Sequence, residues 1–183
     1  MKTLAFQQVD VFTAVPFKGN PVAVVLEGDA LSSADNADGL GVMAADVQRA
    51  AIIDVGPVWF TVQLASGDVV RGLAPDMGKL AALKPLGITG VNVFGLYPRG
   101  AGSDLEVRSF APGEGIPEDP VCGSGNGCVA ALVRRDGVLT APTYVASQGR
   151  CLGRDGHVTV QFDGGTIWLG GHAVTCVEGS LRV

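Results

Sequence analysis

The chain has 183 residues and a formal net charge of −5, and its acidic and basic residues are mixed along the sequence. This length suits one domain, or one domain with a fragment of another. The absence of a basic stripe excludes nucleic acid as an expected partner, and no apolar run approaches the roughly 18 residues of a membrane-spanning helix.

The composition favours a globular protein with a substantial core, because 47% of the residues are hydrophobic and only 17% are charged. The 27 glycines follow no collagen-like period, so they indicate many tight turns. The apolar N-terminal run is cut short by Gln7 and Gln8, which fits neither a secretory signal nor a membrane anchor. We therefore expect a cytoplasmic protein without a membrane partner.

Runs rich in β-branched residues predict a series of short strands separated by Gly and Pro turns. In chain order, these predicted strands are 5–12, 21–26, 52–54, 58–65, 91–96, 105–110, 143–146, 157–162, 167–169 and 173–177. Between the second and third of them, residues 27–41 are polar and small, which marks the best candidate for a domain boundary.

Three stretches predict helices. Leu40 and Val47 belong to an i, i+3, i+4, i+7 apolar pattern over 40–47, and a short helix over 75–83 has Pro75 near its start. The third helix, 128–135, ends at Asp136-Gly137 and is apolar nearly all round, so we expect it to be buried. The predicted class is α+β, with a strongly bent or barrel-like sheet packed on at least one helix.

The stretch from Phe110 to Cys128 carries the candidate chemistry. Glu118 and Asp119 stand just ahead of the run Gly-Ser-Gly-Asn-Gly, 123–127, which opens the third helix. A helix start offers unpaired N–H groups and a positive dipole end, so Gly123, Gly125 and the neighbouring N–H groups would hold a carboxylate or a phosphate. Proton-transfer chemistry on a small acid needs such an anion site with an acid or base beside it.

Three side chains beside this anion site are candidate catalytic groups. They are the carboxyl of Asp119 as proton carrier, the hydroxyl of Ser124, and the thiol of Cys122, whose pKa a helix start lowers. Each also has a structural interpretation. Asp119 would only fix a turn, the glycines would pack the helix end, and Cys122 would fill space. The run is not Gly-x-Gly-x-x-Gly, so nucleotide binding is poorly supported.

The cysteines and histidines do not form a metal-binding pattern. No Cys-x-x-Cys pair exists, and His157 and His172 are fifteen positions apart, so we predict no metal site. Both histidines are expected to be structural or solvent-facing, and Cys128, Cys151 and Cys176 to be packing residues.

Three stretches together resemble the PhzF-like family, which shares its fold with diaminopimelate epimerase. They are 9–25, which contains Phe-Lys-Gly-Asn-Pro, 108–124 with Glu-Asp-Pro-Val-Cys-Gly-Ser, and 148–154 with 169–174 after it. The resemblance implies two lobes, each a curved sheet around a central helix, with the active site between them. Its founding member isomerises a dihydro-hydroxyanthranilate in phenazine biosynthesis, without metal or organic cofactor.

The resemblance also implies roles for particular residues. Asp119, Gly123 and Ser124 occupy the positions of the second lobe's functional Asp, Gly and Ser, and Cys122 stands where the epimerases keep a catalytic cysteine. Asn20, in Gly-Asn-Pro, resembles a first-lobe residue near the cleft that touches substrate. The family's catalytic Glu segment and Gly-His-Pro motif have no counterpart here, and Cys122 or Glu118 would have to substitute.

The resemblance divides the chain unequally. Residues 1–34, with 170–183 returning to them, would be a remnant of the first lobe, and 40–169 would be the second lobe with the candidate site. Such a remnant would expose an apolar face and open strand edges, so we expect a homodimer, with a swapped arrangement as one form of it.

The sequence therefore predicts an isomerase- or epimerase-type protein that moves a proton on a small carboxylic acid. Its activity would be impaired by the loss of the first-lobe catalytic Glu. The alternative is a degenerate, non-catalytic module that binds a small acid or associates with another chain.

Overall fold

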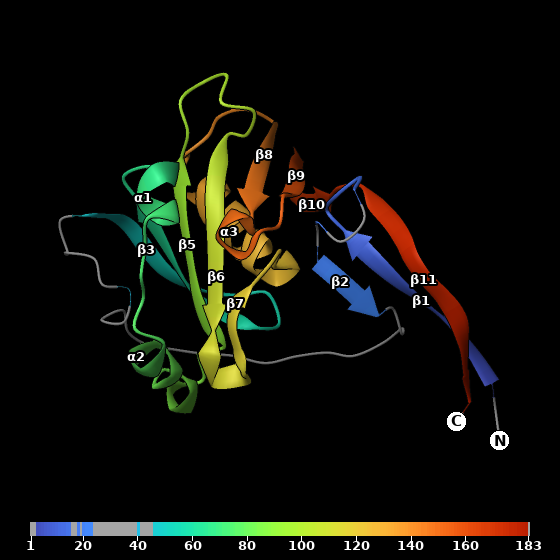
Figure 1. The fold of residues 1–183 in the computed structure, drawn as a ribbon. Coiled ribbons are helices and arrows are strands. Elements are labelled where there is room, and N and C mark those ends of the chain that lie inside the picture. Colours follow the sequence, from blue (N-terminus) through green and yellow to red (C-terminus); the bar gives the residue numbers. More distant parts are fainter. Residues whose placement is uncertain (1–2, 16–17, 19, 24–39, 41–45, 183) are drawn as a thin grey trace.

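Strands in two sheets form the framework of the described chain (Figure 1). The computed structural model describes residues 3–15, 18, 20–23, 40 and 46–182, and side chains for 12–15, 18, 40 and 46–179. Among these residues, no helix is long and apolar enough to cross a membrane.

The smaller sheet joins the two ends of the described chain. Its strand order is β11-β1-β2, all antiparallel. The register runs from Thr3 opposite Arg182 to Val11 opposite Ala173, with one irregularity after Gln8. The strands are β1 (Thr3–Val11), β2 (Asn20–Ala23) and β11 (Ala173–Arg182).

The larger sheet is mixed and curls around one helix. Among the described strands its order is β10-β9-β8-β6-β5-β4-β3, with β7 paired to β6, and the pairs β4–β5 and β6–β8 are parallel. The strands are β3 (Val47–Asp54), β4 (Val58–Leu64), β5 (Gly90–Leu96), β6 (Leu105–Ala111), β7 (Ile116–Asp119), β8 (Thr143–Gln148), β9 (Gly156–Asp163) and β10 (Thr166–Gly170).

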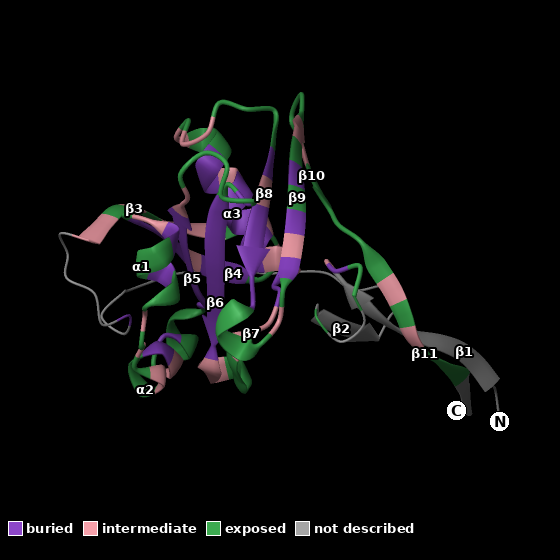
Figure 2. Ribbon diagram, turned by 45° about the horizontal axis from the view of Figure 1, so that its top comes forward, coloured by how far each residue is buried: buried purple, intermediate pink, exposed green. Residues whose placement is uncertain are grey.

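Helix α3 (Gly123–Arg135) lies inside the curl, and short helices cover the outer face. Its apolar residues form the main core with the inward-facing side chains of the strands, among them Val107 and Val158, and Figure 2 shows this buried centre. The outer elements are α1 (Gly67–Arg71), α2 (Met77–Ala81) and the 3-10 turns η2 (Lys84–Leu86), η3 (Pro112–Glu114) and η4 (Arg150–Leu152).

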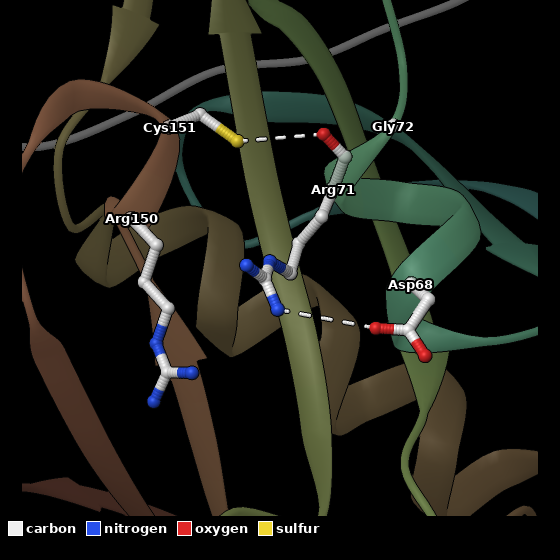
Figure 3. A pocket seen from close by; sticks show the side chains of 5 residues that line it. All are labelled: Asp68, Arg71, Gly72, Arg150 and Cys151. Atoms are coloured by element: carbon white, nitrogen blue, oxygen red, sulfur yellow. Dashed lines mark hydrogen bonds and ion pairs between the residues drawn. The ribbon is translucent and has the colours of Figure 1, made fainter.

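Strand β6 faces both layers. Val107 belongs to the core around α3, whereas Phe110 belongs to a second apolar cluster under α1 and α2. Because side chains alternate along a strand, Glu106 and Arg108 lie on the outer face with Phe110. Beyond them, α1 and η4 border a hollow of about 440 Å³, which Figure 3 shows from close by.

The predicted class and the buried central helix are confirmed, but several boundaries differ. Helix α3 begins at Gly123 rather than 128, so the glycine run forms its first turns instead of a loop before it. Helix α2 ends at Ala81, with Asp76 accepting hydrogen bonds from two N–H groups at its start. The chain also forms α1 and β7, neither of which was predicted.

Part of the predicted N-terminal organisation lies outside the described residues. Residues 24–39 are not described, which leaves the predicted boundary over 27–41 untested except at Leu40. Most of the predicted helix over 40–47 also lies outside the described residues, at 41–45, and its predicted end is wrong, because Val47 begins β3.

Candidate functional site

The carboxyl of Asp119 lies at the end of β7, four residues before α3 begins. Its Oδ1 accepts a hydrogen bond from the N–H of Val121 at 3.0 Å, which fixes the turn between strand and helix. Burial raises the pKa of the Asp119 carboxyl above its usual range, although hydrogen bonds from Val121 and Cys122 oppose the shift. The turn-forming and proton-carrying interpretations are therefore compatible, because a half-buried carboxyl that fixes the turn is still able to take up a proton.

Cys122 is the N-cap of α3, and its Sγ accepts the N–H of Gly125 at 3.3 Å. Burial, followed by the charge of Asp119, raises the pKa of the Cys122 thiol to about 11. The expectation that the helix start lowers this pKa is wrong, because the loss of solvent outweighs the lowering by the hydrogen bonds with Ser124 and Gly125. At neutral pH the residue is a thiol that can donate a proton to an acceptor, and it is not a ready nucleophile.

The hydroxyl of Ser124 lies beside the thiol of Cys122. Its Oγ accepts a hydrogen bond from the indole N–H of Trp59 at 3.1 Å and lies 3.6 Å from the Sγ of Cys122. Because the indole occupies the oxygen as an acceptor, the hydroxyl hydrogen remains available for a thiol or an incoming acid.

Two N–H groups at the start of α3 are available to an anion. The N–H of Asn126 donates to the Cys122 carbonyl at 3.0 Å and that of Gly125 to the Cys122 sulfur. The N–H groups of Gly123 and Ser124 take part in none of the hydrogen bonds found among the described residues, as expected at a helix start. A Cβ on Gly123 would meet no atom within 4 Å, so there is room beside them.

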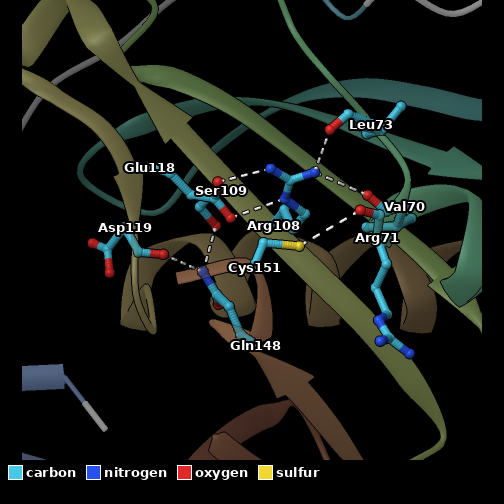
Figure 4. Close-up of polar contacts among 9 residues, drawn as sticks. All are labelled: Val70, Arg71, Leu73, Arg108, Ser109, Glu118, Asp119, Gln148 and Cys151. Carbon is cyan, nitrogen blue, oxygen red and sulfur yellow. Dashed lines mark hydrogen bonds and ion pairs between the residues drawn. The ribbon is translucent and has the colours of Figure 1, made fainter. Parts of the chain in front are cut away.

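The carboxamide of Gln148 holds the site together from β8. Its Oε1 accepts from the Cys122 N–H at 3.2 Å and from Asn126 Nδ2 at 2.8 Å. Its Nε2 donates to the Asp119 carbonyl at 3.0 Å and to Ser109 Oγ at 3.4 Å (Figure 4). One fully buried amide thus ties β6, β7 and α3 together around the candidate proton carrier.

The first turn of α3 needs glycine where it meets the sheet. A Cβ on Gly125 would lie 2.5 Å from Asn92 Oδ1 and 2.7 Å from Ser109 Oγ. Gly125 is therefore required for close packing of the helix on the strands, so the structural interpretation holds for this one glycine of the run, whereas Gly123 has open space around it. This packing role leaves the N–H groups of Gly123 and Ser124 available to bind an anion.

Glu118 is not a free acid or base. Its two carboxylate oxygens accept from Nε and Nη2 of Arg108 at 2.9 and 2.8 Å, and the two side chains are 7% and 8% exposed. Arg108 also donates to the carbonyls of Val70 and Leu73. The proposal that Glu118 replaces a missing catalytic Glu is therefore wrong, because the carboxylate is consumed by a buried bidentate pair (Figure 4).

Other candidates lie elsewhere or remain untested. Asn20 begins β2, but its side chain is not among those described, so its contact with substrate stays a prediction. His157 and His172 line a separate hollow of about 450 Å³ beside Phe12.

Sequence reasoning missed Trp59 and Gln148 as members of the site. The sequence pointed to Gln148 only through its place in the stretch 148–154, which belongs to the family resemblance.

Comparison with known proteins identifies the chain's relatives. Residues 32–179 match the family model PhzC-PhzF, described as phenazine biosynthesis-like protein. The chain is 33% identical over 158 residues to Antisense-enhancing sequence 1 of Schizosaccharomyces pombe, which covers 82% of this chain and 52% of the relative. It is 30% identical over 145 residues to that organism's Uncharacterized isomerase C186.06, covering 72% of this chain and 75% of the relative. Against the first of these, the chain thus spans about half the relative's length.

A solved structure shows the same fold. The Bacillus anthracis phenazine biosynthesis protein of the PhzF family matches with a TM-score of 0.73 at 16% identity, covering 100% of both chains. At that identity the likeness concerns the fold alone, and it agrees with the curled mixed sheet around α3.

Proposed function

Because the chain belongs to the phenazine biosynthesis-like (PhzC-PhzF) family, we propose that it transfers a proton on a small carboxylic acid, as an isomerase- or epimerase-type enzyme without a cofactor. The observation that carries this proposal is the Asp119 carboxyl, whose pKa burial raises, beside two available N–H groups at the start of α3. A carboxyl whose pKa lies closer to neutral can both take up and release a proton.

In the proposed reaction, each of these groups has one step. The substrate carboxylate binds to the N–H groups of Gly123 and Ser124 and to the Ser124 hydroxyl, where the dipole of α3 favours negative charge. The ionised Asp119 removes a proton from the carbon next to the activating group, and the protonated Asp119 returns it at the new position. Gln148 keeps the Asp119 backbone and the Cys122 N–H at a fixed separation during both transfers.

One observation favours a non-catalytic alternative, a module that binds a small acid or associates with another chain. Among the described residues of the site, Glu118 is paired with Arg108 and Cys122 holds its proton, so Asp119 is the carboxyl left to carry protons. One carrier suffices for a shift on a single face of the substrate, but an inversion requires a second group on the opposite face.

Deuterium exchange separates the two. The protein is incubated in D₂O with a dihydro-hydroxyanthranilate and a panel of cyclic and α-substituted acids, and NMR follows wash-in at carbon. We expect wash-in that is lost in Asp119→Asn, which keeps the Val121 hydrogen bond but cannot take up the proton. Wash-in that persists in this variant would contradict the role of Asp119. Line broadening of an acid without any exchange would favour the binding module.

We also propose that the protein is a homodimer, with exchange of the small sheet as one form of it. Strand β11 is exposed or only half-buried from Ala173 to Gly179, and Val177 is 44% exposed, although β11 pairs with β1 along its length. A second copy would cover this surface. Sedimentation at micromolar concentration should show a dimer, and a folded monomer would contradict the proposal.

A further inference from the structure

The hollow between α1 and η4 is lined by Asp68, Arg71, Gly72, Arg150 and Cys151 (Figure 3). Arg71, from the end of α1, and Arg150, from η4, both extend their guanidinium groups toward it. Their side chains are 45% and 38% exposed, so the hollow is open to solvent on the side where the charges stand.

The acidic neighbours only partly neutralise these two charges. Asp68 lies 3.9 Å from Arg71 and is 79% exposed, and Asp155 lies 3.6 Å from Arg150 and is 59% exposed. Exposed pairs at such distances are weak and are screened by salt. Two guanidinium groups bordering one hollow repel each other, and an anion placed between them converts that repulsion into attraction.

Arg71 has a half-buried tyrosine beside it. The Tyr97 hydroxyl raises the pKa of the Arg71 guanidinium. The same hydroxyl donates to Oε2 of Glu106 at 2.9 Å, and Ser147 Oγ donates to that oxygen at 2.6 Å. Glu106 is fully buried, so β6 and β8 fix the position of the Tyr97 hydroxyl beside the exposed Arg71.

Local packing keeps this support in contact with the helix. A Cβ on Gly67, at the start of α1, would lie 2.6 Å from the Tyr97 ring, so the ring fits beneath α1 because position 67 is glycine. A guanidinium fixed by its surroundings loses less conformational entropy when it binds a ligand.

This hollow is separate from the Asp119 site. Glu106 lies on the outer face of β6, whereas the neighbouring Val107 faces the core around α3. Ser109 also faces inward, where it meets Gln148 and the first turn of α3. The two places therefore lie on opposite faces of one strand and share no lining residue.

We propose that the hollow is a binding site for the phosphate group of a small metabolite, with Arg71 and Arg150 as its two ligating residues. A single guanidinium fork satisfies a planar carboxylate, whereas two forks from different segments suit the several oxygens of a phosphate. The volume of about 440 Å³ exceeds the size of a phosphate ion, so the organic part of the metabolite would fill the rest.

The test uses inorganic phosphate as the probe on the intact chain. Phosphate is titrated while NMR follows the Nε–H signals of Arg71 and Arg150, with sodium chloride at matched ionic strength as reference. We expect saturable shifts with a dissociation constant of about 1 mM. Phosphate should also slow alkylation of Cys151 by iodoacetamide, since this exposed thiol lines the same hollow. Shifts that match those in sodium chloride, or do not saturate, would overturn the proposal.

Variants distinguish a built site from general surface charge. Arg71→Gln and Arg150→Gln should each weaken phosphate binding about tenfold or more, because each removes charge-assisted hydrogen bonds. Tyr97→Phe should weaken it severalfold with the charge unchanged. Arg135→Gln is the matched control, an exposed arginine paired with Asp136 away from the hollow, and it should have no effect. Equal weakening in this control would refute the assignment.

The outcome does not depend on the proton-transfer proposal. Asp119→Asn should bind phosphate as the parent protein does, since Asp119 does not line this hollow. Succinate at the same ionic strength tests the anion class, and tighter binding of succinate than of phosphate would overturn the assignment to phosphate.

Discussion

Replacing Glu118 by Gln tests how much of the stability depends on the buried ion pair with Arg108. The two side chains are 7% and 8% exposed and share two hydrogen bonds at 2.9 and 2.8 Å. Removing one partner of such a pair costs about 3–5 kcal/mol, because the other charge stays buried. Arg108 keeps its hydrogen bonds to the carbonyls of Val70 and Leu73, so we expect the lower end, about 3 kcal/mol.

Urea unfolding measures this loss of unfolding free energy. The melting temperature should also fall by roughly 6–12 °C, since 1 kcal/mol corresponds to about 2–4 °C at this chain length. The matched control is Glu114→Gln, which breaks the exposed pair with Lys84 at 3.0 Å and should cost under about 1 kcal/mol. A second variant, Arg108→Met with Glu118→Leu, should recover most of the loss. If Glu118→Gln were no more destabilising than Glu114→Gln, the reasoning about burial would be refuted.

Three further predictions concern the start of α3. Burial raises the pKa of Asp119 above the 3.8 of an ordinary Asp, so the folded state binds more protons than the unfolded state, and stability falls as the pH rises from 3.8 through the raised pKa. Urea unfolding from pH 3 to 8 should show this fall in the parent protein but not in Asp119→Asn. The same pH dependence in both proteins would contradict the prediction. Gly125→Ala should cost about 1–3 kcal/mol of unfolding free energy, since its Cβ would lie 2.5 Å from a neighbouring side-chain oxygen. Gly123→Ala, with open space around its Cβ, should cost far less, and equal costs would count against this packing argument. The Cys122 thiol, with its pKa raised to about 11, should resist iodoacetamide at pH 8 while exposed Cys151 reacts; mass spectrometry showing Cys122 labelled first would be inconsistent with burial.

The strands were largely predictable because their signal is local. Val58 to Leu64 is apolar or β-branched except at Gln63, as expected for a strand covered on both faces. From Leu105 to Arg108, apolar and charged residues alternate, which is the two-residue period of a strand. Strand β7 has no such signal, since Pro117, Glu118 and Asp119 are poor strand formers that pair because β6 lies beside them.

The start of α3 was missed for a related reason. Glycine has a low helix propensity, so a run of three glycines in five residues indicates a loop when local preference alone is considered. The helix nevertheless begins at Gly123, because only a residue without a side chain fits at Gly125 against the strands. Tertiary packing, which sequence spacing does not show, decided this boundary.

The candidate site was predictable as a motif but not as a network. Asp119 and Ser124 could be named from their positions around the helix start. Trp59 is 65 residues away from the serine that it contacts, and Gln148 bonds to residues of three other elements. The pairing of Arg108 with Glu118 depends on the β6–β7 register, which could not be inferred once β7 itself was missed.

The pairing of β1 with β11 has a consequence for synthesis on the ribosome. Strand β1 ends at Val11 and β11 begins at Ala173, so at translation rates of roughly 5–20 residues per second about 8–32 s pass between them. During this interval β2 is the sole described strand that can pair with β1, and the other edge of β1 is open. On one messenger, the chain on the ribosome ahead completes β11 while the following chain still has an open edge of β1, so β1 of one chain can pair with β11 of another before its own β11 is made.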